Sequence, residues 1–203
     1  MNYPPIEPKR LNGTEPITDE QGNPVSDLNS FWSWAYSNVM DNAQRGALAE
    51  YLVACALGVN DNVRVNWDKY DLLSPEGISV EVKSFGYLQS WEQEHLSTLS
   101  FGIQPTYGWD SASNTYRQAD IYVFCIHKHT HQGTANPLDI AQWDFYLLPT
   151  TILNEKAGEQ KRASLSSLIK MGAEKCDYQN LHKRIIELIR PGYSVSDNFK
   201  TTE

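Results

Sequence analysis

The chain has few cysteines, no long hydrophobic run and no excess of positive charge, and each shortage excludes a class of protein. Its three cysteines are odd in number and far apart, which fits neither a zinc site built from CxxC pairs nor a disulfide framework. No apolar run approaches the roughly 18 residues that a membrane-spanning helix needs. The net charge of −8 excludes a surface coated with positive charge for indiscriminate binding of polyanions. We therefore expect a cytoplasmic protein that does not enter a membrane.

The length of the chain allows one well-buried core. With 203 residues, of which 40% are hydrophobic, the chain suffices for one domain and is too short for two independent ones. Residues 1–28 are rich in proline and acidic side chains and show neither a strand nor a helix period, so we expect an irregular N-terminal arm. This arm also lacks the apolar segment of a signal peptide. The predicted domain covers residues 29–190, and residues 191–203 form a C-terminal tail.

Hydrophobic patterns predict helices at both ends of this domain and strands between them. An aromatic-rich segment begins at Asn29 or Ser30 and ends at Gly58, which predicts one long helix or two shorter ones. Runs of strand-forming residues follow at 63–67, 70–73, 78–83, 96–103, 120–127 and 143–148. Helical spacing returns at residues 164–171 and 178–189. This order of elements predicts an α/β or α+β domain.

A short hairpin at residues 69–83 carries the most informative side chains. Pro75 and Gly77 suit a three-residue loop, because proline favours the turn and glycine can take the left-handed conformation after it. Counting back from this loop predicts which residues face each other: Leu72 and Val80, Asp71 and Glu81, Lys69 and Lys83. The apolar side chains then share one face of the hairpin, while Asp71, Glu81 and Lys83 project from the other.

Two carboxylates that face each other across a hairpin repel, so Asp71 and Glu81 need a cation between them. Two carboxylates supported by a backbone carbonyl and waters are a ligand set that suits Mg²⁺. Lys83 would lie beside that metal, where it can hold a water or balance the charge on a phosphoryl group. The alternative is a solvent-exposed hairpin whose charges only keep the protein soluble.

Glu50 is a second sign of a polar site. It is the only charged residue between Gly46 and Leu57, so its carboxylate is expected in apolar surroundings. A buried carboxylate without a partner costs several kcal/mol or becomes protonated, so a lysine, an arginine or a metal-bound water should lie within reach. The alternative to a role at a metal is an ion pair with Arg45 or Lys83.

The arrangement resembles the restriction-endonuclease-like superfamily, whose PD-(D/E)xK motif has an acid on one strand and D/E-x-K on the next. The matching residues are Asp71, followed by Glu81-Val82-Lys83, and Glu50 on the preceding helix. The similarity covers roughly residues 45–84. One residue departs from the motif, since Tyr70 stands where the motif name has proline.

This resemblance implies a mixed β-sheet flanked by helices and a metal-dependent endonuclease, of restriction or defence type, that hydrolyses DNA phosphodiester bonds. The metal would be Mg²⁺, with Mn²⁺ as a substitute, and its ligands would be Asp71, Glu81 and the Val82 carbonyl. Lys83 would position the attacking water and stabilise the transition state. Glu50 would orient a metal-bound water or support a second metal.

Contacts to nucleic acid are expected from a basic segment. Residues 155–190 contain eight Lys or Arg and five Asp or Glu, a net charge of +3 in a chain of −8. Lys161, Arg162, Lys183 and Arg184 are therefore the candidates for phosphate contacts. Gln89, soon after the motif, is a further candidate because Gln is a routine contact to phosphates and bases. The alternative for the basic segment is a solvated helix face with mixed charges.

A second functional class stays open beside the nuclease. A non-catalytic nucleic-acid-binding or assembly module could keep the same fold, and the net charge of −8 favours it mildly. Two carboxylates beside a lysine favour the enzyme, because a binding module has no need of anionic side chains where a phosphate must approach. The sequence also leaves open DNA against RNA and a monomer against a homodimer.

Overall fold

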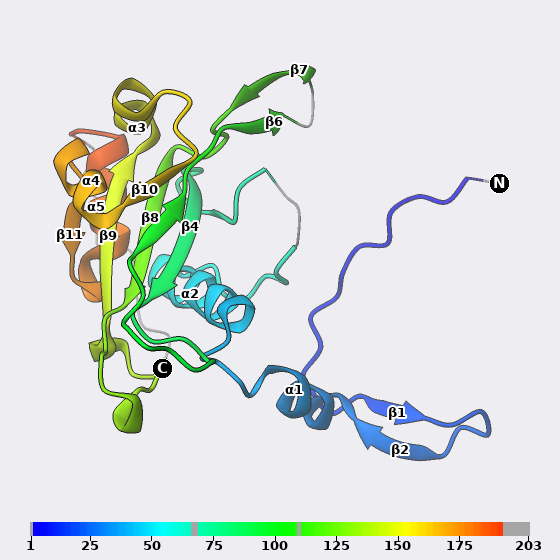
Figure 1. Cartoon of the computed structure of the whole chain (residues 1–203). Coiled ribbons are helices and arrows are strands. Elements are labelled where there is room, and N and C mark those ends of the chain that lie inside the picture. The colour runs from blue at the N-terminus through cyan, green and yellow to red at the C-terminus, as the bar shows by residue number, and fades with distance from the viewer. Residues whose placement is uncertain (1, 66–68, 109–110, 193–203) are drawn as a thin grey trace.

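The computed structural model describes residues 2–65, 69–108 and 111–192, and its centre is a mixed five-stranded β-sheet (Figure 1). The strands lie in the order β11 (Glu174–Cys176), β9 (Trp143–Pro149), β8 (Ile121–His127), β4 (Ser79–Gly86) and β3 (Leu72–Leu73). β4 and β8 are parallel, and the other neighbours are antiparallel. β8 is buried along its whole length, as its largely apolar sequence predicts. The predicted mixed α/β class is confirmed.

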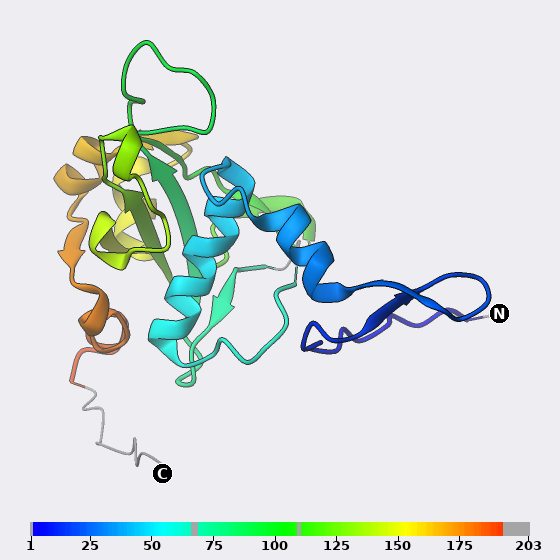
Figure 2. The same ribbon diagram turned by 90° about the horizontal axis from the view of Figure 1, so that it is seen from below.

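Helices cover both faces of this sheet, and each face has its own hydrophobic core (Figures 1 and 2). α2 (Asn42–Leu57) and α5 (Leu181–Ile189) pack on the face to which Val80 and Val82 of β4 point. The other face is covered by α3 (Thr150–Ala157), α4 (Leu165–Met171) and a small sheet of β5 (Ser100–Gly102) and β10 (Arg162–Ser164). Across the described residues, no helix is both long and apolar enough to cross a bilayer.

The segment before Gly58 forms two helices rather than one. α1 (Leu28–Tyr36) begins earlier than expected, because Asp27 caps it by accepting a hydrogen bond from the Ser30 N–H at 2.7 Å. α2 is capped by Asp41 and ends at Gly58, whose φ of +70° confirms the predicted left-handed residue. α1 buries none of its residues, so it stands apart from the core.

The β3–β4 hairpin has the register that its loop predicts. Leu72 pairs with Val80, and the Ser74 N–H donates to the Ile78 carbonyl at 2.9 Å to close the loop. Gly77 has a φ of +77°, which a residue with a side chain adopts only with strain. The ladder ends at Leu72, so neither the expected pairing of Asp71 with Glu81 nor that of Lys69 with Lys83 is part of it.

The N-terminal arm differs from the expectation of an irregular segment. Its second half folds into a β-hairpin of β1 (Pro16–Thr18) and β2 (Pro24–Asp27), which extends away from the sheet (Figures 1 and 2). Asp19 makes the turn by accepting hydrogen bonds from the Gln21 and Asn23 N–H groups. Proline is tolerated here because both strands of a two-stranded hairpin are edge strands.

The remaining elements are short. β6 (Thr106–Gly108) and β7 (Ser111–Tyr116) form a hairpin beside the core, and 3₁₀ helices cover η1 (Gln132–Thr134), η2 (Ile140–Gln142) and η3 (Tyr178–Asn180). Residues 63–65 form no strand, and residues 66–67 of the same predicted run lie outside the described residues. The tail predicted at residues 191–203 also lies outside them, apart from its first two residues.

Candidate active site

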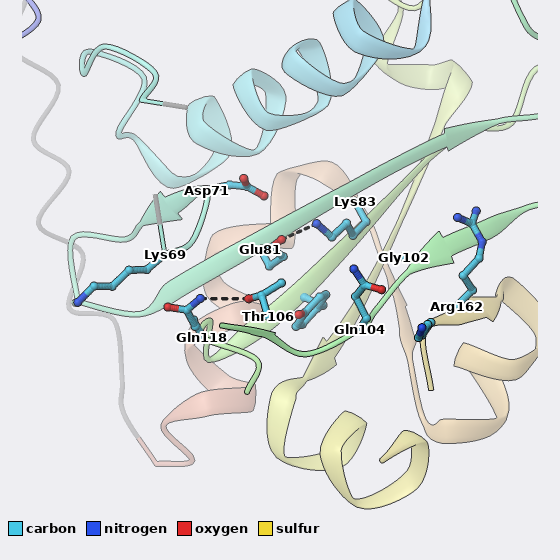
Figure 3. A pocket seen from close by; sticks show the side chains of 11 residues that line it. Lys69, Asp71, Glu81, Lys83, Gly102, Gln104, Thr106, Gln118 and Arg162 are labelled. Atoms are coloured by element: carbon cyan, nitrogen blue, oxygen red, sulfur yellow. Dashed lines mark hydrogen bonds and ion pairs between the residues drawn. The ribbon is translucent and has the colours of Figure 1, made fainter. Parts of the chain in front are cut away.

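A cavity of about 480 Å³ opens beside the β3–β4 hairpin, on the sheet face opposite α2 (Figure 3). Asp71, Glu81 and Lys83 all line it, so the structure brings together the three central residues of the predicted motif. Most of the other lining residues are polar or cationic. The full set is Lys69, Gly102, Gln104, Thr106, Gln118, Tyr122, Lys161 and Arg162. Such a lining suits a charged, hydrated ligand better than an apolar one.

Strand alternation places Glu81 and Lys83 in this cavity. Their neighbours Val80 and Val82 point to α2, so Glu81 and Lys83 project from the opposite face of β4. The two side chains form an ion pair, shown as a dashed line in Figure 3. Asp71, at the edge of the sheet just before β3, completes the group.

Asp71 is held against the β4 backbone beyond the end of the β3 ladder. Its main-chain N–H donates to the Val80 carbonyl at 3.1 Å, and its carboxylate accepts the Val82 N–H at 2.7 Å. The N–H and C=O of one strand residue point to the same side of the strand. The Val82 carbonyl therefore faces the same sheet edge as Asp71, as the resemblance requires of a metal ligand.

Crowding of carboxylates makes the Asp71 site electrostatically unfavourable when no cation balances it. Burial, the Glu81 carboxylate and, to a smaller extent, the Glu50 carboxylate raise the pKa of Asp71 to about 7. The Val82 N–H and the Lys83 ammonium act in the opposite direction and offset only part of this effect. A divalent cation would relieve the repulsion between Asp71 and Glu81.

The donor set fits a hard divalent cation such as Mg²⁺ or Mn²⁺. Two carboxylates and the Val82 carbonyl offer only oxygen ligands, and a cavity of about 480 Å³ leaves room for waters and a phosphate. Within residues 2–65, 69–108 and 111–192, no three His, Cys, Asp or Glu side chains gather into one metal-binding group. A metal at this site would therefore take much of its coordination from water and substrate.

Glu50 does not reach the cavity that Glu81 and Lys83 line. The Arg64 guanidinium binds both oxygens of its carboxylate, one of them through Nη2 at 2.8 Å, on the α2 side of the sheet edge. The expectation that Glu50 needs a partner is thus confirmed. The partner is Arg64, neither Arg45 nor Lys83, because the chain after Gly58 folds back over α2.

The four basic candidates divide into two pairs. Lys161 and Arg162 line the cavity with Asp71, and Arg162 lies at the opposite end from Lys69 (Figure 3). Lys183 and Arg184 lie on α5, where Glu187 pairs with both and Glu174 of β11 binds Arg184 at 2.5 Å. Because β11 and β3 are at opposite edges of the sheet, the second pair does not belong to the candidate site.

Gln89 has a structural role instead of the expected nucleic-acid contact. Its side chain is buried and accepts a hydrogen bond from Arg45 at 3.0 Å, while its amide N–H group donates to the Gly86 carbonyl and Ser97. Arg45, itself buried, also donates to the Leu88 carbonyl at 2.9 Å. These contacts fix the chain that follows β4.

Several residues of the cavity were not among the predicted site residues. Tyr122 is the clearest, since it is the register partner of Glu81 on the parallel strand β8. Burial and the Glu81 carboxylate raise the pKa of its phenol, so Tyr122 stays protonated and can donate a hydrogen bond. Together with His127, Tyr122 is one of two polar-tipped residues in an otherwise apolar strand, and this was a readable signal. Gln104 and Gln118 carried none, because only the tertiary structure brings them to the cavity.

Comparison with known proteins supports a nuclease. The model of the family described as bacteriophage T4 endonuclease IV matches residues 29–167, more than half of the chain. The matched segment includes Asp71, Glu81 and Lys83 together with Lys161 and Arg162. No curated protein matches the chain.

Proposed function

Because the chain belongs to the bacteriophage T4 endonuclease IV family, we propose that it is a metal-dependent endonuclease that hydrolyses DNA phosphodiester bonds in the cavity lined by Asp71, Glu81 and Lys83. The observation that carries this proposal is the pair of carboxylates, Asp71 and Glu81, beside a lysine in a polar cavity. The burial of Asp71 and its repulsion by Glu81, which together raise the pKa of Asp71, are tolerable in a site built for a cation and have no use in a binding surface for DNA.

Asp71, Glu81 and the Val82 carbonyl would hold Mg²⁺, with Mn²⁺ as a substitute. When bound, the metal supplies a Lewis acid for the phosphoryl oxygen and lowers the pKa of a coordinated water. We assign Asp71, Glu81 and Lys83 to a PD-(D/E)xK motif in which Tyr70 takes the place of the proline. A role in restriction or defence is a further expectation that follows from the resemblance, and a cytoplasmic location is one that follows from the composition of the chain.

Lys83 is the residue to which we assign transition-state stabilisation. Its ammonium pairs with Glu81 and can turn toward a phosphoryl group that approaches the same cavity. Tyr122 can donate a hydrogen bond from the neighbouring strand, as its phenol is protonated. Glu50, which is bound to Arg64, acts on this site only through its charge on Asp71.

The cationic side chains around the cavity would hold the DNA backbone. Lys69 and Arg162 lie at opposite ends of it, and Lys161 lies beside Arg162 in the sequence (Figure 3). Such a row lets an overall acidic protein accept a polyanion locally, because exposed charges act over about a Debye length of 10 Å or less. A phosphodiester would thus reach Asp71 and Glu81 between cations.

The experiment that tests this function uses purified protein with plasmid DNA and with single-stranded DNA, in Mg²⁺, Mn²⁺ or EDTA. We expect cleavage in either metal, none in EDTA, and a loss of more than about 100-fold in Asp71→Asn and in Glu81→Gln. Asp61→Asn is the matched control, since Asp61 is 96% exposed in its side chain. DNA binding with no cleavage in any metal would instead favour the non-catalytic module.

A further inference from the structure

A second cavity lies directly beside the candidate active site, between α2, β3 and residues 59–65. It has a volume of about 370 Å³, within the usual range of ligand pockets. Tyr51 of α2, Tyr70 before β3, and Val63 and Val65 of the connecting chain form an aromatic and aliphatic lining. Asn60 and Asn62 add amide groups, and the Glu50–Arg64 ion pair forms the charged side.

The two cavities share one residue, Asp71. Asp71 lies at the sheet edge, where the cavity of Glu81 and Lys83 opens on one face and the cavity of Tyr51 on the other. A ligand group bound at Asp71 is therefore within reach of both linings. The charged cavity suits a phosphodiester, and the aromatic one suits the flat, apolar face of an organic ring.

We propose that the second cavity binds the nucleobase next to the bond that is cut. This proposal rests on the proposed nuclease function and names how that site holds its substrate. A phosphate at Asp71 and Glu81 carries its own nucleoside, and the second cavity begins at the shared residue Asp71, with the Glu50 carboxylate in its wall already paired with Arg64. The base would stack on Tyr51 or Tyr70, and Asn60 or Asn62 would meet its polar edge.

The cavity has consequences for the shape of the DNA. A base can enter a pocket between α2 and β3 only when it is unpaired or turned out of the duplex. Tyr51 is 51% exposed and offers its ring without any rearrangement of the core. The enzyme would thus hold one nucleotide by its phosphate on one face of the sheet edge and by its base on the other.

The first test is photochemical cross-linking in EDTA, which does not require cleavage. Oligonucleotides carrying 5-iodouracil in place of thymine are irradiated with the protein, and the modified residues are mapped by mass spectrometry. We expect cross-links at Tyr51 or Tyr70, retained in Tyr36→Ala. Tyr36 is the matched control, a tyrosine that is 53% exposed on α1. Cross-links confined to exposed aromatic residues outside the cavity, such as Trp34 or Trp91, would overturn the proposal.

The second test uses substrates around a bond that the wild type is found to cut. Tyr51→Ala should lower kcat/KM about 10- to 100-fold on the intact strand, as loss of base stacking does. The same variant should lose less than about 2-fold on a strand with an abasic nucleotide at the flanking position, because the contact is then already absent. Tyr51→Phe, which keeps the ring, should behave as the wild type. Equal losses on intact and abasic strands would contradict the proposal.

The two tests separate this inference from the proposed function. Cross-links at Tyr51 in a protein that cuts no DNA in any metal would leave the base cavity standing and remove the nuclease. Cleavage that depends on Asp71 and Glu81, but is unchanged in both Tyr51→Ala and Tyr70→Ala, would keep the nuclease and remove the base cavity.

Discussion

Two clusters on this protein each combine acidic and basic side chains, but only one of them leaves a charge without a partner of opposite sign. At the β3–β4 edge, Asp71 and Glu81 line one cavity and Lys83 pairs with Glu81, so a carboxylate is left without its own cation. At the α5–β11 edge, Glu174 and Glu187 bind Arg184. The first arrangement raises the pKa of Asp71, while the second raises the pKa of Arg184 and stabilises its charge.

Whether a charged side chain is balanced by its neighbours distinguishes a functional site from a structural ion pair better than the net charge of a sequence segment does. The basic segment has an excess of positive charge in the sequence, yet the Lys183–Arg184 part of it is neutralised by its own neighbours. The hairpin has no such excess and still gathers unfavourable charge. Natural proteins keep this kind of imbalance where a ligand or a reaction needs it.

The largest effect is expected from Lys83→Ala. Removal of the ammonium should lower kcat about 100- to 1,000-fold, as expected for a group that acts on transition-state charge, while Mn²⁺ affinity stays nearly unchanged. Single-turnover cleavage and calorimetric titration measure the two quantities. Lys170→Ala, at an exposed position of α4, is the matched control. An unchanged rate would remove Lys83 from the site.

The next effect concerns stability without metal. The folded protein holds the pKa of Asp71 at about 7, against about 3.9 for an unperturbed carboxyl, so ionisation of Asp71 disfavours the folded state as pH rises from about 4 to 7. Asp71→Asn should therefore raise the free energy of unfolding at pH 8 in EDTA by about 1–3 kcal/mol, and by less at pH 5. Urea unfolding at the two pH values measures this.

Bound metal should reverse the order of stability of the wild type and Asp71→Asn. Mn²⁺ binding to the folded wild type should raise its melting temperature at pH 8, and Asp71→Asn should gain little. A variant that is less stable than the wild type in EDTA at pH 8 would show that Asp71 is not under electrostatic strain.

A smaller effect is expected on DNA affinity, and it compares the two basic pairs directly. Replacing Lys161 and Arg162 by glutamine should weaken DNA binding about tenfold. The slope of the logarithm of the binding constant against the logarithm of the salt concentration should become shallower by about 1 for each lost phosphate contact. The same change at Lys183 and Arg184 should leave both quantities unchanged, because these charges are paired at the far sheet edge. Fluorescence anisotropy across a salt series measures the affinity and its salt dependence for each variant. Equal losses of affinity from both pairs would contradict the assignment of DNA binding to Lys161 and Arg162 alone.

The smallest effect belongs to the α5–β11 cluster. Arg184→Gln should lower the free energy of unfolding by less than about 1 kcal/mol, since Arg184 and its two glutamates are well exposed. The sign is opposite to that expected for Asp71→Asn, which makes the pair of variants a test of the comparison itself. Thermal unfolding of both variants in low and high salt measures the two stability changes. A gain in stability in Arg184→Gln would contradict the prediction.

The sequence by itself determined the features that depend on neighbouring residues. The loop at Pro75–Gly77 fixes the register of β3 and β4. Hydrogen bonds between Asp71 and the β4 backbone, just beyond that ladder, then hold Asp71 at the cavity of Glu81 and Lys83. Gly58 ends α2 for a reason equally local, its left-handed backbone. The hairpin at residues 16–27 was also encoded locally, in the turn at Asp19, but the flanking prolines concealed it.

Only the tertiary structure decided which distant segments meet. Glu50 needed a partner, and the fold of residues 59–65 over α2 supplied Arg64. β10 pairs with β5 and brings Arg162 to the cavity, whereas α5 packs beside α2 and leaves Arg184 at the other edge. Gln89 became buried because Arg45, 44 residues earlier in the chain, reaches it. Periodicity and turn chemistry fix local geometry, while the packing of the two cores on opposite sheet faces fixes these encounters.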